Sequence, residues 1–422
     1  MLLHGLLLID PHVPPAPGWL RIAGGRIAEI GEGDPPRGES IDAGGGNPGA
    51  GAGVGVTICP GFIDAHIHLP QLGSIGCDGL DLMSWLEQVI YPVELIWANK
   101  SHAEAQANEA YGRLLAAGTL GFAGYLSSHA QSIAAATKAA HRLPLRAIVG
   151  QVLMDREGPG GLIGQAPARL SRSEKGRLDT SLNPRFAVAC SDALLADTGR
   201  RLAEGYPFSF KQREAGDMGV NLFVQTHLAE TREEVARVRE LFPDDDHYAG
   251  VYDRHGLLGP HTLLAHCLHL SDAEWDLIAE RGSVVVHCPS ANTFLRSGLF
   301  DINAARRRGI RVALGSDVAA GCDLAMPRVA RAMIEVAKLR RMTIDPGAHV
   351  PSPAEAWTMI TRGNADALGF GDMGRIEMGA SADLLVLRSP AEIDEHLIGR
   401  LIYCWREEWI AQRIVRGRVM AS

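Results

Sequence analysis

The sequence has few cysteines, and their spacing fits neither a zinc ribbon nor a disulfide scaffold. Seven are present, an odd number, and no two are spaced as Cys-x-x-Cys: Cys59, Cys77, Cys190, Cys267, Cys288, Cys322 and Cys404. Paired spacing is the usual sign of structural zinc, and an even set in a short chain is the usual sign of a disulfide framework. The scattered pattern argues against both and predicts a protein of the reducing cytoplasm.

Long apolar runs and an excess of positive charge are also absent. No stretch approaches the roughly 18 apolar residues that a membrane-spanning helix needs. The apolar start, Leu2–Ile9, has no basic residues before it and runs straight into Asp10, which predicts a strand and not a signal peptide. With 49 acidic and 41 basic residues the net charge is −8, which argues against a general affinity for nucleic acid or anionic membranes. Small molecules are the expected partners.

Base editing of nucleic acid is a further function that the sequence argues against. The zinc deaminases of that class combine His-x-Glu with Pro-Cys-x-x-Cys, and this pair is missing. The stretch 44–49 satisfies Gly-x-Gly-x-x-Gly formally, but Pro48 interrupts it and no helical pattern follows. We therefore expect residues 44–55 to form a surface loop and not a dinucleotide site.

The two ends of the chain have the pattern of strands. Residues 19–30 alternate apolar and polar side chains around Gly24-Gly25, which predicts a β-hairpin. Past Gly374 the stretches 379–387 and 409–419 again favour strands. A chain of 422 residues is long enough for one barrel-sized domain and a smaller one. We predict a small β domain built from residues 1–59 and 375–422.

Between these ends, short apolar runs alternate with amphipathic helices. The runs include residues 143–149, 186–190, 221–226, 262–266, 283–287 and 311–315. Three of the helices begin at capping sequences that start at Thr231, Ser271 and Ser352. Such repetition over about 300 residues indicates a parallel α/β architecture. The favoured form is a (β/α)8 barrel over residues 60–374.

Five residues that can bind metal or carry protons follow apolar runs at predicted strand ends. These are His66 and His68, then His227, His266 and Asp317. Two histidines with one residue between them project from the same side of a strand, and the carboxyl ends of barrel strands are where catalytic groups belong. Taken singly, each is more often a structural side chain. Together they predict a divalent cation with one coordination position left for water.

Glu230 follows His227 by three residues, where a strand should give way to a helix beginning at Thr231. An acidic residue there could serve only to complement the helix dipole. Beside a metal-bound water it would instead be the natural group for proton transfer.

Several motifs carry a resemblance to a known family. They are Pro60–Gln71, His227–Glu230, His287-Cys288-Pro289 with Asn292, Gly315-Ser316-Asp317, and Asn183-Pro184-Arg185-Phe186 followed by Cys190-Ser191. Together they resemble the amidohydrolase superfamily over roughly residues 1–420. The Arg-Phe pair after a proline and Gln71, three residues beyond His68, are most similar to its guanine-deaminating branch.

The resemblance implies a fold, a reaction and a set of roles. The fold would be a distorted (β/α)8 barrel with a β-sandwich made of both chain ends, in a homodimer. One Zn²⁺ per chain would be bound by His66, His68, His227 and Asp317. Glu230 would move protons, His266 would hold the attacking water and Asp317 would accept its proton. Gln71, Arg185 and Phe186 would hold the purine during hydrolysis of guanine to xanthine and ammonia, a step of purine catabolism.

Two positions depart from the pattern of that branch. Asp323 adds a carboxylate after the metal-binding Asp317, and Ala291 stands where serine is usual. They leave open a rival substrate with the same 2-amino-4-oxo edge, such as a pterin or 8-oxoguanine, because a pocket that selects the shared edge rejects an altered second ring weakly. A non-catalytic binding protein is a further alternative. Without the resemblance, a surface ion pair for Arg185 and core packing for Phe186 would be preferred.

Overall fold

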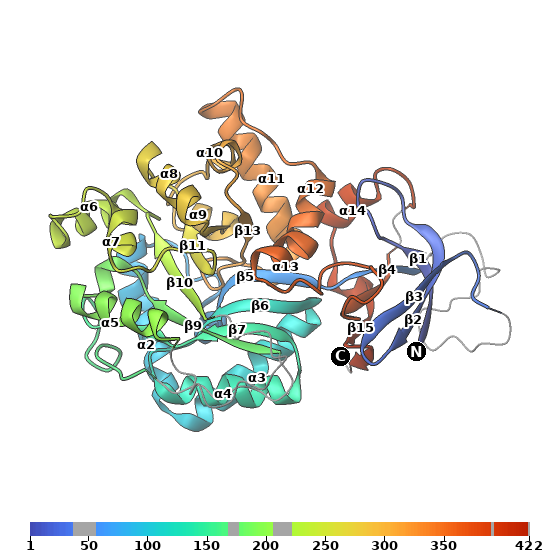
Figure 1. Cartoon of the computed structure of the whole chain (residues 1–422), viewed down its shortest axis with the longest axis horizontal. Coiled ribbons are helices and arrows are strands. Elements are labelled where there is room, and N and C mark those ends of the chain that lie inside the picture. Colours follow the sequence, from blue (N-terminus) through green and yellow to red (C-terminus); the bar gives the residue numbers. More distant parts are fainter. Residues whose placement is uncertain (37–55, 168–176, 206–221, 390–391, 421–422) are drawn as a thin grey trace.

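Eight parallel strands form a nearly closed barrel (Figure 1). The structure, a computed structural model, describes residues 1–36, 56–167, 177–205, 222–389 and 392–420. The expected loop at 44–55 lies outside these ranges. Within them, the barrel strands follow one another in chain order: β5 (Phe62–His68), β6 (Thr119–Tyr125), β7 (Arg146–Gly150), β9 (Leu178–Pro184), β10 (Phe223–Leu228), β11 (Thr262–His266), β12 (Val284–His287) and β13 (Val312–Leu314). The short β8 (Val152–Leu153) pairs with β9. The predicted barrel is confirmed.

Asn364 bridges the first and last barrel strands. Its side-chain nitrogen donates to the carbonyl oxygens of Ile63 on β5 (2.6 Å) and Leu314 on β13 (2.8 Å), and its oxygen accepts from Leu314 N (2.8 Å). Beyond the strand ends, Asp317 N donates to His66 O (2.8 Å). These bonds satisfy buried backbone groups that would otherwise lack partners, and they hold β13 beside β5.

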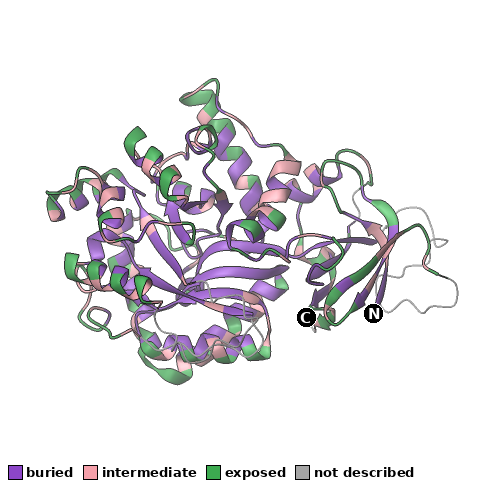
Figure 2. Ribbon diagram, in the orientation of Figure 1, coloured by how far each residue is buried: buried purple, intermediate pink, exposed green. Residues whose placement is uncertain are grey.

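Helices surround the barrel with their exposed faces outward, while the strands inside are buried (Figure 2). The helices of this layer are α3 (Lys100–Ala116), α4 (Ala130–Arg142), α5 (Asp192–Ala203), α6 (Arg232–Leu241), α7 (Tyr248–Arg254), α8 (Asp272–Arg281), α9 (Pro289–Phe294), α10 (Ile302–Arg307), α11 (Met326–Thr343), α12 (Pro353–Thr358) and α13 (Asn364–Ala367), with α14 (Leu397–Tyr403) beside α11 and α12. The predicted helix starts at Thr231, Ser271 and Ser352 are confirmed, and each forms a capping box. No helix among the described residues is both long and apolar enough to cross a membrane.

Both ends of the chain contribute to a second sheet beside the barrel (Figure 1). Among the described residues it has seven strands, in the order β16-β15-β14-β4-β1-β2-β3. Their bounds are β1 (Leu2–Leu7), β2 (Ala16–Ala23), β3 (Arg26–Glu32), β4 (Val56–Pro60), β14 (Leu384–Arg388), β15 (Ile410–Val415) and β16 (Arg418–Met420). The predicted hairpin turns at Gly24 and Gly25, whose φ angles of +58° and +80° suit the turns that favour glycine. The predicted terminal sheet is confirmed, and the exact domain boundaries stay a prediction.

A buried ion pair joins the sheet to the barrel. Arg177, just before β9, donates from both terminal nitrogens to the carboxylate of Asp383, just before β14, at 2.9 and 2.8 Å. The backbone of Asp383 also accepts from Gly61 N (3.0 Å), at the junction of β4 and β5. A bidentate pair fixes geometry as well as charge, so the start of β5 has a fixed relation to the sheet.

One expected strand is wrong. The apolar run 186–190 contains the 3-10 turn η4 (Ala187–Ala189), and the barrel strand is β9, which ends at Pro184. Proline has no N–H with which to continue a ladder. The amide of Ala187 instead donates to the hydroxyl of Tyr248 (3.2 Å). In the structure, Arg185 and Phe186 therefore lie just beyond the end of β9.

Candidate active site

Three acidic and imidazole side chains alternate along β5. Asp64, His66 and His68 are all buried and occupy every second position of this strand. The carboxylate of Asp64 accepts from His66 N (3.1 Å), Ser316 N (2.9 Å) and Ser316 Oγ (2.5 Å). Burial raises the pKa of Asp64 to about 6, although the hydrogen bonds from Ser316 and His66 act against this rise. Asp64 thereby connects β5 to the loop that carries Asp317.

Four side chains converge at the carboxyl ends of β5, β10 and β13. One ligand atom each from His66, His68, His227 and Asp317 all lie within 4.8 Å of one another. Asp317 Oδ1 lies 3.3 Å from His66 Nε2 and 3.4 Å from His68 Nε2. The structure thus brings together the four residues that the sequence predicted as metal ligands.

The imidazole of His227 has a lone pair on the ring nitrogen that faces the other members of the cluster. The backbone oxygen of Arg185 can only accept, so His227 Nδ1, 2.6 Å away, carries the hydrogen and His227 Nε2 has the lone pair. That nitrogen lies 3.2 Å from His68 Nε2. Burial, together with neighbouring histidines, lowers the pKa of His227 well below its ordinary value and that of His68 to about 4.

His66 and Asp317 also have the chemistry that a metal ligand needs. The buried Nε2 of His66 has no hydrogen-bond partner among the described residues. Burial alone would raise the pKa of Asp317, but the imidazoles of His66 and His68, 3.3 and 3.4 Å from its Oδ1, hold it well below its usual range. Neutral imidazoles and an ionised carboxylate are the donors that zinc prefers, so the residues fit such an ion.

Glu230 and His266 lie next to this group. His266 Nε2 is 3.4 Å from Glu230 Oε2 and 3.7 Å from Asp317 Oδ2, and its Nδ1 is 2.8 Å from Asn292 Oδ1. Ser297 Oγ donates to Glu230 Oε1 at 2.9 Å. Burial and the nearby Asp317 raise the pKa of Glu230 to about 8, against the effect of the Ser297 bond. A carboxyl of this kind can hold a proton at neutral pH and give it up.

Arg185 and Gln71, which were predicted to bind the substrate, both donate hydrogen bonds to one buried acid, Glu94. Glu94 accepts from Arg185 Nη1 (2.6 Å), from Arg185 Nη2 (3.1 Å) and from Gln71 Nε2 (2.9 Å). Gln71 lies on the turn η1 (Leu69–Ser74), directly after β5. All three side chains are buried.

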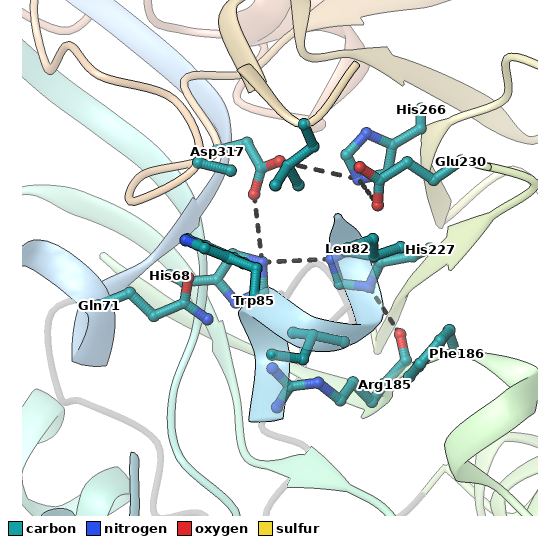
Figure 3. Close-up of a pocket in the computed structure, with 13 residues that line it drawn as sticks. His68, Gln71, Leu82, Trp85, Arg185, Phe186, His227, Glu230, His266 and Asp317 are labelled. Carbon is teal, nitrogen blue, oxygen red and sulfur yellow. Dashed lines mark hydrogen bonds and ion pairs between the residues drawn. The ribbon is translucent and has the colours of Figure 1, made fainter. Parts of the chain in front are cut away.

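A cavity lies among several of these groups (Figure 3). Its walls include His68, Gln71, Arg185, Phe186, His227, Glu230, His266 and Asp317. Leu82 and Trp85 of α1 (Leu82–Trp85) and Leu86 of the π-helix η2 (Leu86–Ile90) supply an apolar wall. A cleft with apolar walls and a small number of polar groups that converge on it is typical of a small-molecule site.

The backbone is strained where several strands end. Ala229, His266 and Asp317 have φ angles of +51°, +71° and +51°, in the left-handed region that residues with a Cβ seldom adopt. Such positions cost on the order of 1–3 kcal/mol each and gather at functional sites. Here they occur at the end of β11 and in the turns that follow β10 and β13.

Neither departure from the family pattern lies on the cavity wall. Asp323 pairs with Arg328 and accepts from Ala325 N (2.9 Å), and it is not among the lining residues. Ala291 is buried in α9 and is also not a lining residue. The carboxylate of Asp323 is therefore not added to the cavity.

Sequence reasoning missed the apolar wall and the supporting polar residues. Glu94 lies on α2 (Tyr91–Leu95), inside a long excursion after β5, and nothing in its local pattern marks it. Ser297 follows α9 in an irregular turn. Asp64 could have been found, because it continues the alternation of His66 and His68 by one step. Tyr125 pairs with His68 across β5 and β6, with ring centroids 4.6 Å apart.

Comparisons with known proteins agree with this geometry. The model of the Amidohydrolase family matches residues 57–420. A guanine deaminase of Escherichia coli (strain K12) is 33% identical over 346 residues, which are 80% of this chain and 74% of that protein. The crystal structure of guanine deaminase from C. acetobutylicum with bound guanine in the active site superposes with a TM-score of 0.87 at 25% identity, covering 100% of this chain and 99% of the other. An adenosine deaminase from Xanthomonas campestris with bound zinc has a TM-score of 0.79 at 25% identity, with 99% and 92% covered.

Proposed function

Because this chain belongs to the amidohydrolase family, we propose that it hydrolyses guanine to xanthine and ammonia at a zinc centre. The chain is similar to guanine deaminases in sequence and in structure. Membership of the family makes it a hydrolase that acts on C–N bonds. The proposal adds the substrate, the metal and the product.

One observation carries the proposal. His68, His227 and Asp317 of the four-residue cluster line a single cavity together with Glu230 and the hydrogen-bonding pair Gln71 and Arg185. A metal site alone would support many hydrolytic reactions. Gln71 and Arg185 favour those reactions whose substrate is flat and has a carbonyl edge, because amide and guanidinium groups offer hydrogen-bond donors to such an edge.

His66, His68, His227 and Asp317 would hold the zinc ion. The ion would supply Lewis acidity, which lowers the pKa of water from 15.7 to about 7 and makes hydroxide available at neutral pH. The inward lone pair of His227 and the low pKa of Asp317 support this role, since ligands must be deprotonated to bind a metal.

The cavity would orient the purine from two sides. Arg185 and Gln71 would donate hydrogen bonds to its carbonyl oxygen, and Phe186 would cover one ring face. Trp85 and Leu82 belong to the apolar wall, which would exclude water from the remaining surface. The reacting carbon, C2, would then point toward Glu230 and Asp317.

The protons would move through three side chains. Asp317, ionised by its low pKa, would accept a proton from the attacking water as oxygen adds to C2. His266 donates from Nδ1 to Asn292 Oδ1, so its Nε2 has a lone pair with which to hold that water. Glu230, protonated near neutral pH, would give its proton to the ring nitrogen, then take up the proton of the new hydroxyl group on C2 and pass it to the amine. The proton held by Asp317 would afterwards restore Glu230. The C2–N bond breaks, and xanthine and ammonia leave.

Ammonia release from a small substrate panel tests the proposal. The purified enzyme should release ammonia from guanine with a larger kcat/KM than from 8-oxoguanine or isoxanthopterin. A hundredfold preference for the pterin would contradict the guanine assignment. Release from none of the three, in protein loaded with Zn²⁺, would favour a non-catalytic binding protein.

Assembly and location complete the proposal. We expect a cytoplasmic homodimer that acts in purine breakdown, which the family resemblance and the unpaired cysteines support. Light scattering of the purified protein should give a mass of twice 45.2 kDa. A monomeric mass would contradict the homodimer.

A further inference from the structure

Glu94 is a buried acid to which the proposed reaction assigns no role. It lies on α2, is 1% exposed and is not a wall residue of the cavity. An ionised carboxylate is costly to bury unless it is paired and hydrogen-bonded. The contacts that it makes therefore indicate why it is there.

Both oxygens of Glu94 receive donors from the recognition pair. Oε2 accepts from Arg185 Nη1, and Oε1 accepts from both Arg185 Nη2 and Gln71 Nε2. Arg185 is 3% exposed and Gln71 is 2% exposed, so water competes little for these bonds. The ring of Tyr91 lies beneath the guanidinium, 5.2 Å from its central carbon. One carboxylate thus ties together two side chains from separate strand ends.

These bonds fix how the pair faces the cavity. The fork to Glu94 uses two of the five N–H groups of Arg185, so three remain for other partners. An ionised carboxylate can only accept, which forces the NH2 group of Gln71 toward Glu94 and its oxygen toward Ala319 N, 3.4 Å away. Without Glu94, the amide of Gln71 could turn over and present oxygen where a donor is needed.

The same bonds cancel the charge of the pair. Burial alone would lower the pKa of Arg185, but the Glu94 carboxylate beside it outweighs this effect and raises the pKa. Arg185 is therefore a cation, and Glu94 is the anion that balances it. Among the described residues, no other acidic side chain forms an ion pair with Arg185. The recognition wall consequently offers hydrogen-bond donors without a net positive charge.

We propose that Glu94 is the positioning residue that sets the specificity of this wall for a neutral carbonyl edge over an anionic ring. The inference rests on the proposed function and deepens it. Deamination replaces an amino group by a second carbonyl, and the dioxo product loses a ring proton more readily than the substrate does. A charge-balanced wall binds the neutral substrate and does not hold the anionic form of the product.

Variants of Glu94 with inhibitors of different charge test the proposal. Hypoxanthine, a neutral 6-oxopurine, and urate, an anion at pH 7, are measured as competitive inhibitors of guanine turnover. In Glu94→Gln, the uncompensated Arg185 should favour urate, so the ratio of Ki for urate to Ki for hypoxanthine falls by about tenfold or more. KM for guanine should rise more than kcat falls, and bound zinc should stay unchanged. Glu87→Gln, an exposed acid on the preceding η2, is the matched control and should leave the ratio unchanged.

Glu94→Asp separates charge from position and decides the matter if Glu94→Gln does not fold. It keeps the anion but shortens its reach, so KM should rise while the inhibitor ratio stays near that of the wild type. An unchanged ratio in folded Glu94→Gln, or an equal fall in Glu94→Asp, would overturn the role of Glu94. A wild-type enzyme inactive on guanine would instead contradict the proposed function, which the same assay detects before any variant is made.

Discussion

Replacing Glu230 by glutamine should remove activity and stabilise the metal-free protein at the same time. Glutamine keeps the size of the side chain and the oxygen that accepts from Ser297, but it cannot exchange a proton. General acid–base groups typically contribute about 10²–10⁴ in rate, so kcat should fall by about that factor while zinc remains bound.

The stability gain follows from the pKa of Glu230. Its value rises from 4.5 to about 8 in the folded protein, mainly through burial and repulsion by Asp317. The folded state therefore binds this proton more tightly than the unfolded state does, and the stabilisation is complete below pH 4.5 and is lost as the pH rises through 8. Each pKa unit corresponds to about 1.4 kcal/mol, so the full loss is about 5 kcal/mol. Glu230→Gln, neutral at every pH, avoids this loss.

Unfolding of the chelated protein in denaturant, at three pH values, measures the effect. Glu230→Gln should exceed the wild type in free energy of unfolding by about 1 kcal/mol at pH 5, about 3 at pH 7 and about 5 at pH 9. Glu233→Gln, an exposed acid in the first turn of α6, is the control and should show no such trend. A difference that stays constant with pH would refute the argument that Glu230 is buried against Asp317. Full turnover in Glu230→Gln would refute its role in proton transfer.

Three further predictions concern the metal and the barrel. Chelation should abolish turnover and lower the melting temperature, and added Zn²⁺ should restore both, since a ligand that binds only the folded state stabilises it; unchanged melting after verified metal loss would contradict this. Gly315→Ala would place a Cβ 2.6 Å from the Cβ of His66, so it should cost about 1–3 kcal/mol of stability and reduce the bound zinc measured by atomic absorption; full occupancy would show that the strand end can shift freely. Asn364→Ala removes three hydrogen bonds to Leu314 N and to two carbonyl oxygens between β5 and β13 and should cost about 2–4 kcal/mol in denaturant unfolding; a neutral effect would mean that other bonds close the barrel.

Much of the site could be predicted because barrel topology converts order along the chain into proximity. His66, His227 and Asp317 are far apart in sequence, yet each follows an apolar run that ends at the same rim. The period of two along β5 placed His66 and His68 on one side. Once the runs were interpreted as parallel strands, their carboxyl ends had to meet.

The residues that could not be predicted lie in segments without a regular pattern of apolar and polar side chains. Glu94 and Trp85 lie in the excursion between β5 and α3, whose short helical pieces have no periodicity that points to a partner. The run 186–190 was misassigned because short apolar segments look alike whether they form a strand or a buried turn. Ser297 reaches Glu230 only through an irregular turn after α9. Such contacts depend on tertiary packing and leave no local signature.

The charges of this site connect its chemistry to its stability. Asp317 and Glu230 repel each other in a buried place, and the lone pair of His227 faces His68. A divalent cation among them would relieve both conflicts, whereas protonation or neutralisation of Glu230 relieves only the first. It follows that the stabilising effect of Glu230→Gln should shrink when zinc is bound, because the cation already offsets the repulsion. On the other wall Glu94 balances Arg185 within the protein itself, so loss of the metal should leave that ion pair in place.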